Sequence, residues 1–125
     1  MKRDMDLVRK ILIWAEDRDE SLTAPRPDNH LAIDGYDDRV VALHVKLLQE
    51  AGFLEASFVE ADGFGIVFAR VRRLTWAGYE FLAAARDDTV WAQTKGVIKS
   101  KTRDVPFSVL QALLIEGVKQ IVGLQ

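Results

Sequence analysis

Cysteine is absent from this 125-residue chain, and histidine occurs only twice. Without cysteine the chain has no disulfide, no thiolate nucleophile and no Cys-based zinc or iron-sulfur site. The two histidines are a loop residue, His30, and one on an apolar helical stripe, His44, which is not the spacing of a metal site. We therefore expect no metal and no cofactor, and the lack of cysteine agrees with a cytoplasmic location.

Long hydrophobic runs are also missing. The most apolar stretch, residues 105–124, contains Gln111, Glu116, Lys119 and Gln120, which a membrane-spanning helix would not tolerate. The first residues, MKRD, are charged, and Arg9 and Lys10 interrupt the apolar positions that follow. We expect neither a signal peptide nor a membrane partner.

A large charge of one sign is lacking too, since 17 basic and 19 acidic residues give a net charge of −2. This average argues against a strongly cationic nucleic-acid binder. It conceals an uneven distribution, because residues 1–69 carry 8 basic and 14 acidic side chains whereas residues 70–103 carry 8 and 3. A basic surface therefore remains available to an acidic protein.

Hydrophobic periodicity predicts most of the secondary structure. It indicates a helix over residues 5–15, a short strand at 31–33, and a helix that follows Asp37 and stops at Gly52. Alternating residues then predict a β-hairpin that turns near Asp62 and Gly63. Three further helices are expected over 76–86, 89–101 and from about 104 to 122, capped by Thr75, by Asp87 or Asp88, and by Asp104.

This order of elements is typical of a winged-helix domain in the α+β class. We expect one domain over residues 1–125, with a winged-helix-like core at 1–74 and a helical extension at 75–125. The tryptophans at positions 14, 76 and 91 lie on apolar stripes and are expected in the core.

The helix after Asp37 has a mixed surface. A helical wheel groups Val40, His44, Leu47, Leu48 and Ala51 on the core side, and it places Ala42 outward with the polar residues Asp38, Arg39, Lys46 and Gln49. His44 is expected to be a hydrogen-bonded core residue. Arg39, Lys46 and Gln49 are candidates for contacting DNA, although any amphipathic helix needs such a polar face.

Basic residues form the second candidate group. Arg70, Arg72 and Arg73 lie near the end of the hairpin, and Lys95 and Lys99 lie opposite the apolar stripe formed by Val90, Trp91, Thr94, Val97 and Ile98. These cations could bind phosphates. The alternative is a solvated strand edge, where basic residues discourage edge pairing.

The last helix carries two apolar stripes. Leu110, Leu113, Leu114, Gly117 and Ile121 form one stripe, and Ile115, Val118 and Val122 form a second one roughly opposite. One stripe can pack on the domain, so the other needs further cover. Ile115, Val118 and Val122 are therefore candidates for a homodimer interface.

No catalytic constellation is present in the sequence. The carboxylate pairs at 37–38 and 87–88 lie where helices begin, and helix capping explains them. The Gly63-Phe64-Gly65 segment joins two strands, so it predicts a turn and not a phosphate-binding loop. We expect the protein not to be an enzyme.

Several segments resemble a known family. The opening MKRDMDLVRKIL, the segment IDGYDDRVVALHVKLLQEAGFLEA, and RLTWAGYEFLAAARDDTVW with the later PFSVLQALL are similar to domain-of-unknown-function family 2513, a group of small bacterial and prophage proteins. The resemblance covers nearly the whole chain. It implies a winged-helix-like fold and a phage or mobile-element context, and it implies no activity.

Two functions remain open. The first is a noncatalytic DNA-associated regulator or accessory protein that binds double-stranded DNA through Arg39, Lys46, Gln49 and the basic residues named above. Asp34, Asp37, Asp38 and Asp62 oppose it, because they occupy the elements that a winged helix presses against DNA. The alternative is a dimerisation module that does not bind DNA.

Overall fold

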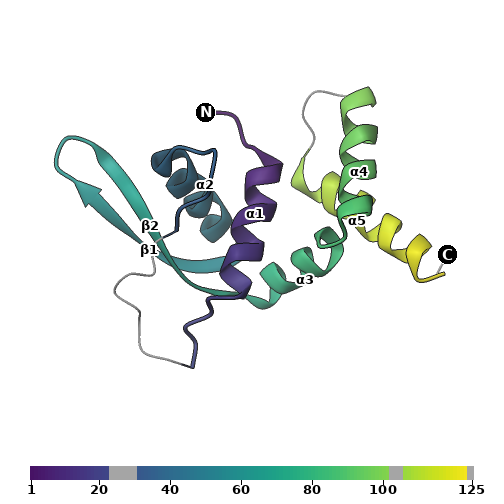
Figure 1. Ribbon diagram of the computed structural model, residues 1–125, viewed down its shortest axis with the longest axis horizontal. Helices are drawn as coiled ribbons and strands as arrows, with labels where there is room; N and C mark the ends of the chain where they lie inside the picture. Colours follow the sequence, from purple (N-terminus) through teal and green to yellow (C-terminus); the bar gives the residue numbers. More distant parts are fainter. Residues whose placement is uncertain (23–30, 102–105, 124–125) are drawn as a thin grey trace. The chain divides into compact units, whose positions relative to one another are not determined.

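The computed structural model describes residues 1–22, 31–101 and 106–123. The elements are α1 (Met5–Glu16), α2 (Asp38–Glu50), β1 (Leu54–Ala61), β2 (Gly65–Leu74), α3 (Trp76–Ala85), α4 (Asp88–Lys101) and α5 (Phe107–Ile121) (Figure 1). They form two compact units, Met1–Tyr79 and Glu80–Gln125. The α+β class, the hairpin and the C-terminal helices are confirmed.

Helix ends follow the local chemistry of the chain. The Asp37 carboxylate accepts from the backbone N–H of Arg39 at 2.8 Å, and the Asp87 carboxylate accepts from Val90 at 2.9 Å. The backbone N–H of Gly78 donates to the Thr75 hydroxyl at 3.2 Å. These caps satisfy N–H groups that have no partner in the first turn of a helix, so three predicted helix starts are confirmed.

The predicted start of α5 is different. Pro106 is the N-cap and the helix begins at Phe107, whereas Pro106 was expected inside the first turn. Asp104, the expected cap, lies outside the described residues.

In the first unit, α1, α2 and the antiparallel hairpin β1-β2 surround one core. Leu7, Ile11 and Leu12 of α1 are fully buried, as are Val41 and Val45 of α2. The hairpin turns at 62–63 as predicted, and Phe64 donates its backbone N–H to Ala61. The segment at 31–33 is not a strand among the described residues. In place of strand pairing, Leu31 donates its backbone N–H to the Ala69 carbonyl of β2 at 3.3 Å.

His44 connects the two helices of this unit. It is completely buried, and its Nε2 accepts from the backbone N–H of Asp4 at 2.9 Å. Because Nε2 accepts, the proton is on Nδ1, which lies 2.8 Å from the Val40 carbonyl and donates to it. The prediction of a hydrogen-bonded core histidine is confirmed.

The buried face of α2 differs from the predicted one. Ala42 is fully buried and Ala51 is exposed, which reverses both expectations. The helix contacts α1 on one side and both strands of the hairpin on another. Its buried stripe is therefore wider than the stripe that a helical wheel predicts for a helix covered on one side, and it is rotated relative to that stripe.

Trp76 does not lie in the core as predicted, because 78% of it is exposed. It is the first residue of α3, where Thr75 and Gly78 face the rest of the unit. Trp76 therefore points away from it. Trp91 is buried as predicted, and Trp14 is partly exposed.

The boundary between the two units lies inside α3, after Tyr79. The start of α3 belongs to the first unit because Thr75 donates its backbone N–H to the Phe53 carbonyl at 3.0 Å. Its hydroxyl also donates to the Gly52 carbonyl.

In the second unit, α4 crosses α5 where Val90 meets Gly117. A methyl group added at Gly117 would lie 2.8 Å from Val90 Cγ1. Val90, Trp91 and Thr94 are buried beside this crossing, whereas Val97 is 47% exposed. The prediction that Val97 packs in the core is wrong, because it lines an open hollow between α4 and α5 together with Leu113 and Gly117.

Candidate functional site

The three polar residues predicted to read DNA from α2 all contact the hairpin. Arg39 donates from its guanidinium to the Phe64 carbonyl, and Gln49 accepts from the Ala56 backbone N–H at 2.7 Å. Lys46 Nζ lies 5.1 Å from the centre of the Phe58 ring, within cation-π range. These side chains hold the hairpin against α2.

The arginines on β2 share a carboxylate. Arg72 and Arg73 lie 3.4 Å and 3.1 Å from the two oxygens of Glu55 on β1. Strand alternation would place neighbouring residues on opposite faces, but the register shifts between Glu55 and Ala56. This bulge sets both arginines against one glutamate.

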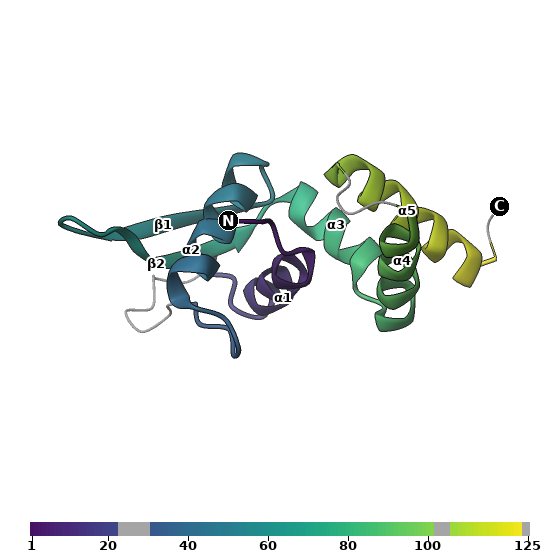
Figure 2. The same cartoon turned by 90° about the horizontal axis from the view of Figure 1, so that it is seen from above.

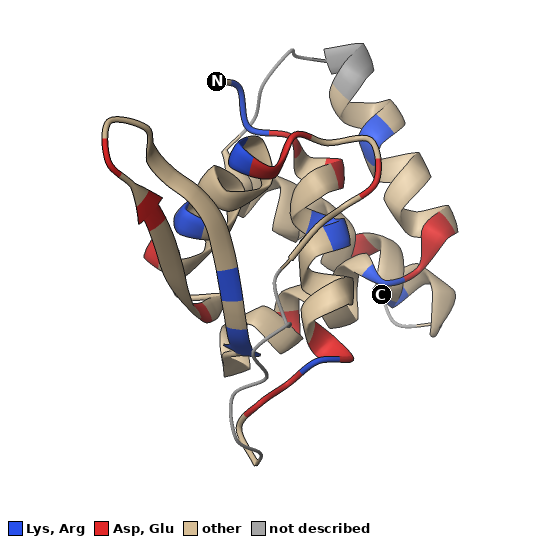
Figure 3. Cartoon of the chain, turned by 60° about the vertical axis from the view of Figure 1, so that its left-hand side comes forward, with Lys and Arg blue, Asp and Glu red and all other residues tan. Residues whose placement is uncertain are grey.

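Acidic residues lie elsewhere on the same hairpin. Figure 3 shows basic positions toward the end of β2, where Arg70, Arg72 and Arg73 lie, and acidic positions near the hairpin loop, where Glu60 and Asp62 lie. Arg70 faces Ser57 across the ladder and is partly buried. The cationic part of the hairpin is therefore short, and Glu55 offsets one of its three positive charges.

The predicted basic residues Lys95 and Lys99 belong to the other unit. Lys95 is partly buried on α4. The side chain of Lys99 lies outside the described residues.

A small polar cluster fixes the segment after α1. The Asp19 carboxylate accepts from the Ser21 backbone N–H at 2.7 Å and from the Tyr79 hydroxyl at 3.1 Å, and the Arg73 guanidinium donates to the Ser21 hydroxyl. Desolvation acts to raise the pKa of Asp19, but the hydrogen bonds from Ser21 and Tyr79 and the charge of Arg73 outweigh it and lower the pKa.

The lowered pKa of Asp19 predicts a pH-dependent stability. A depressed carboxyl pKa stabilises the fold above the unfolded value of about 3.9, and this stabilisation is lost as the pH falls through the folded value. We expect Asp19→Asn to lower the urea midpoint at pH 7 and to change it less at pH 3. Tyr79→Phe should shrink this pH-dependent difference, and equal losses at both pH values would contradict the assignment.

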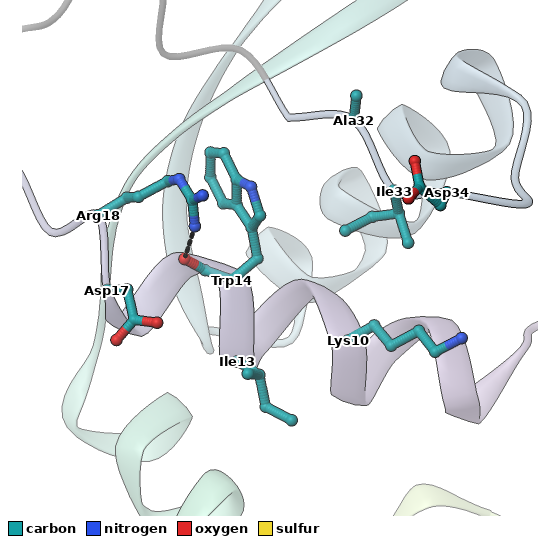
Figure 4. A pocket seen from close by; sticks show the side chains of 8 residues that line it. All are labelled: Lys10, Ile13, Trp14, Asp17, Arg18, Ala32, Ile33 and Asp34. Carbon is teal, nitrogen blue, oxygen red and sulfur yellow. Dashed lines mark hydrogen bonds between the residues drawn. The ribbon is translucent and has the colours of Figure 1, made fainter.

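An open hollow in the first unit lies between α1 and the segment at 32–34 (Figure 4). It measures about 460 Å³. The Arg18 guanidinium lies 4.4 Å from the centre of the Trp14 ring and donates to the Trp14 carbonyl at 3.2 Å. Lys10 and Asp34 line the other end, so the surface is mixed in charge. No pattern in the sequence predicted this hollow.

The second unit has an apolar groove of about 250 Å³ between α3 and α5. All three residues predicted as an interface lie in it: Ile115, Val118 and Val122. Ile115 is 43% exposed and Val122 is 60% exposed. The structure therefore brings the second apolar stripe of α5 together along one groove and leaves it accessible.

The opposite wall of the groove was not predicted. It is formed by Glu80, Ala83 and Ala84 of α3, and Gln111 and Lys119 of α5 complete the lining. The alanine side chains leave space beside the larger aliphatic residues of α5. The sequence signal was indistinct because α3 is apolar around most of its circumference.

Metal clusters and membrane-spanning helices are both absent from the described ranges. Among residues 1–22, 31–101 and 106–123, no three His, Asp or Glu side chains are grouped to hold a metal ion. No helix in these ranges is both long and apolar enough to cross a bilayer.

Comparisons with known proteins give a consistent assignment. Residues 2–104 match the family described as hypothetical protein DUF2513. An uncharacterized protein of Haemophilus influenzae is 35% identical over 123 residues, which cover 98% of this chain and all of that protein. No solved structure matches the chain. Because the family match and the relative both extend over most of its length, the chain belongs to the DUF2513 family.

Proposed function

We propose that this chain is a noncatalytic protein-interaction module whose α3-α5 groove accepts an apolar helix of a protein partner. The observation that carries the proposal is the groove itself, in which Ile115, Val118 and Val122 are partly exposed beside two alanines. Helices bind in such grooves through side chains spaced three and four residues apart.

The side chains of α2 support this choice over DNA reading. A recognition helix needs polar side chains that reach base edges. Here Arg39, Lys46 and Gln49 already contact the hairpin, and the acidic Asp37 caps the start of the helix. If the start of α2 approached DNA, the phosphates would lie beside this carboxylate.

A labelled peptide tests the proposal. The peptide carries the α5 sequence FSVLQALLIEGVKQI, and its fluorescence anisotropy is followed as the full chain is added. We expect a saturable rise that weakens at least ~10-fold with Val118→Glu, because a carboxylate would be buried without a partner. Gln93→Glu places the same charge on exposed α4 and should leave binding unchanged.

Circular dichroism of both variants checks that they remain folded. If Val118→Glu unfolds, the more exposed Val122→Glu replaces it. The proposal would be overturned if about 200 µM of wild-type chain, shown by sedimentation velocity to be monomeric, gave no rise, because the free energy of binding would then be weaker than about 5 kcal/mol.

DNA association is the second candidate, favoured by the row Arg70, Arg72 and Arg73 on β2. It predicts binding to mixed duplex DNA that weakens with salt, with a log-log slope of about −0.9 per phosphate contacted. An anisotropy titration at ~50 mM salt with tens of micromolar protein would detect such nonspecific affinity. The interaction module predicts no saturable binding in this titration.

A further inference from the structure

The helical unit Glu80–Gln125 is close to the length of ~40 residues below which domains usually need additional support. Its fully buried large side chains are few and include Phe81, Leu82, Leu110 and Leu114. At the same time Ile115, Ile121 and Val122 are 43%, 59% and 60% exposed on α5. A unit of this size gains stability when a second surface covers such residues.

The charges that line the groove lie toward opposite ends of it. The Phe81 and Phe107 rings are 4.6 Å apart, which places this part of α3 beside the start of α5 (Figure 2). Glu80 precedes Phe81 and therefore lies at the Gln111 end of the groove. Lys119 is about 12 Å further along α5. Within the described part of the chain, neither Glu80 nor Lys119 has an ion-pair partner.

A two-fold axis between two copies of the chain would bring the Lys119 end of one groove to the Glu80 end of the other. When two identical helices pair antiparallel about a central residue, positions equally far on either side of the centre meet, and each contact occurs twice. With Ile115 at the centre, Lys119 of one copy lies opposite Gln111 of the other and beside its Glu80. Glu116, the other acidic residue of this region, lies in a hollow shared with Gln93 and Val97 of α4, away from the groove.

Resting on the proposed function, we propose that the partner in the groove is a second copy of this chain. The two α5 helices lie antiparallel across Ile115, and Lys119 of each copy pairs with Glu80 of the other. The apolar stripe supplies the contact, and the two ion pairs select the orientation and the partner.

Charge reversal tests this pairing by sedimentation velocity on the full chain. Glu80→Lys alone or Lys119→Glu alone sets two like-charge pairs across the axis, and each is expected to raise the dimer Kd about 10-fold. An equimolar mixture of the two variants should recover the wild-type Kd, because the mixed dimer contains two opposite-charge pairs. Glu116→Lys makes the same charge change as Glu80→Lys and should leave the Kd unchanged.

A wild-type chain that is monomeric at about 200 µM would overturn the second-copy assignment. The free energy of dimerisation would then be weaker than about 5 kcal/mol. Equal weakening by Glu116→Lys, or a mixture that associates no better than its components, would overturn the antiparallel arrangement. The α5 peptide titration separates these failures from failure of the proposed function. A monomeric chain whose groove binds the peptide keeps the interaction module and excludes only self-pairing.

Discussion

Gly78→Ala is expected to destabilise the first unit by about 3 kcal/mol or more, although alanine favours helices over glycine by about 1 kcal/mol. A Cβ at this position would lie 2.0 Å from the Phe53 carbonyl oxygen, and backbone cannot move aside as a side chain can. The same carbonyl accepts the Thr75 N–H that fixes the start of α3. The substitution must therefore separate α3 from the α2-β1 turn.

Gly96→Ala is the matched control, because nothing lies within 4 Å of an added Cβ there and Gly96 is also helical. We expect it to be neutral or stabilising by up to ~1 kcal/mol. Urea denaturation followed by circular dichroism measures both changes, and amide exchange at Phe53 localises the first. Similar effects of the two substitutions would show that the close approach at Gly78 is not present in solution.

His44→Leu is expected to cost about 2–4 kcal/mol. It leaves the partly buried N–H of Asp4 without its His44 acceptor and removes the bond to the Val40 carbonyl, so α1 loses its polar link to α2. His44→Gln should recover part of the loss, because an amide oxygen can replace Nε2 as the acceptor. Leu43→Ala, at a neighbouring position that is 40% exposed, should cost less than ~1 kcal/mol.

Urea unfolding of these variants at neutral pH measures the three free energies. If His44→Leu and Leu43→Ala have equal effects, the buried hydrogen bonds contribute nothing measurable. If the glutamine variant is no better than leucine, Asp4 does not depend on an acceptor at this position.

Features determined by neighbours in the sequence were predictable. Asp37, Thr75 and Asp87 cap helices through hydrogen bonds within two or three residues. The glycines at 63 and 65 adopt positive φ in the hairpin turn, which their sequence context also indicated.

Features determined by distant neighbours were not predictable. Ala42 is buried because α2 has neighbours on two sides, and Trp76 is exposed because Thr75 and Gly78 take the inner face of α3. A helical wheel contains no information about which side of a helix a remote segment will cover.

One wall of the candidate groove was predictable from the sequence and the other was not. Ile115, Val118 and Val122 stood out because a second apolar stripe on one helix requires cover. The α3 wall, with Ala83 and Ala84, did not, because small residues in an evenly apolar helix give no directional signal.

Mapping the α5 peptide on the isotope-labelled chain by NMR tests the groove most directly. The proposed function predicts saturable amide shifts at Ala84, Ile115 and Val118, with the hollow beside Trp14 unaffected. Saturable shifts confined to the Trp14 hollow or the hairpin, or no shifts at the groove residues at saturating peptide, would contradict it.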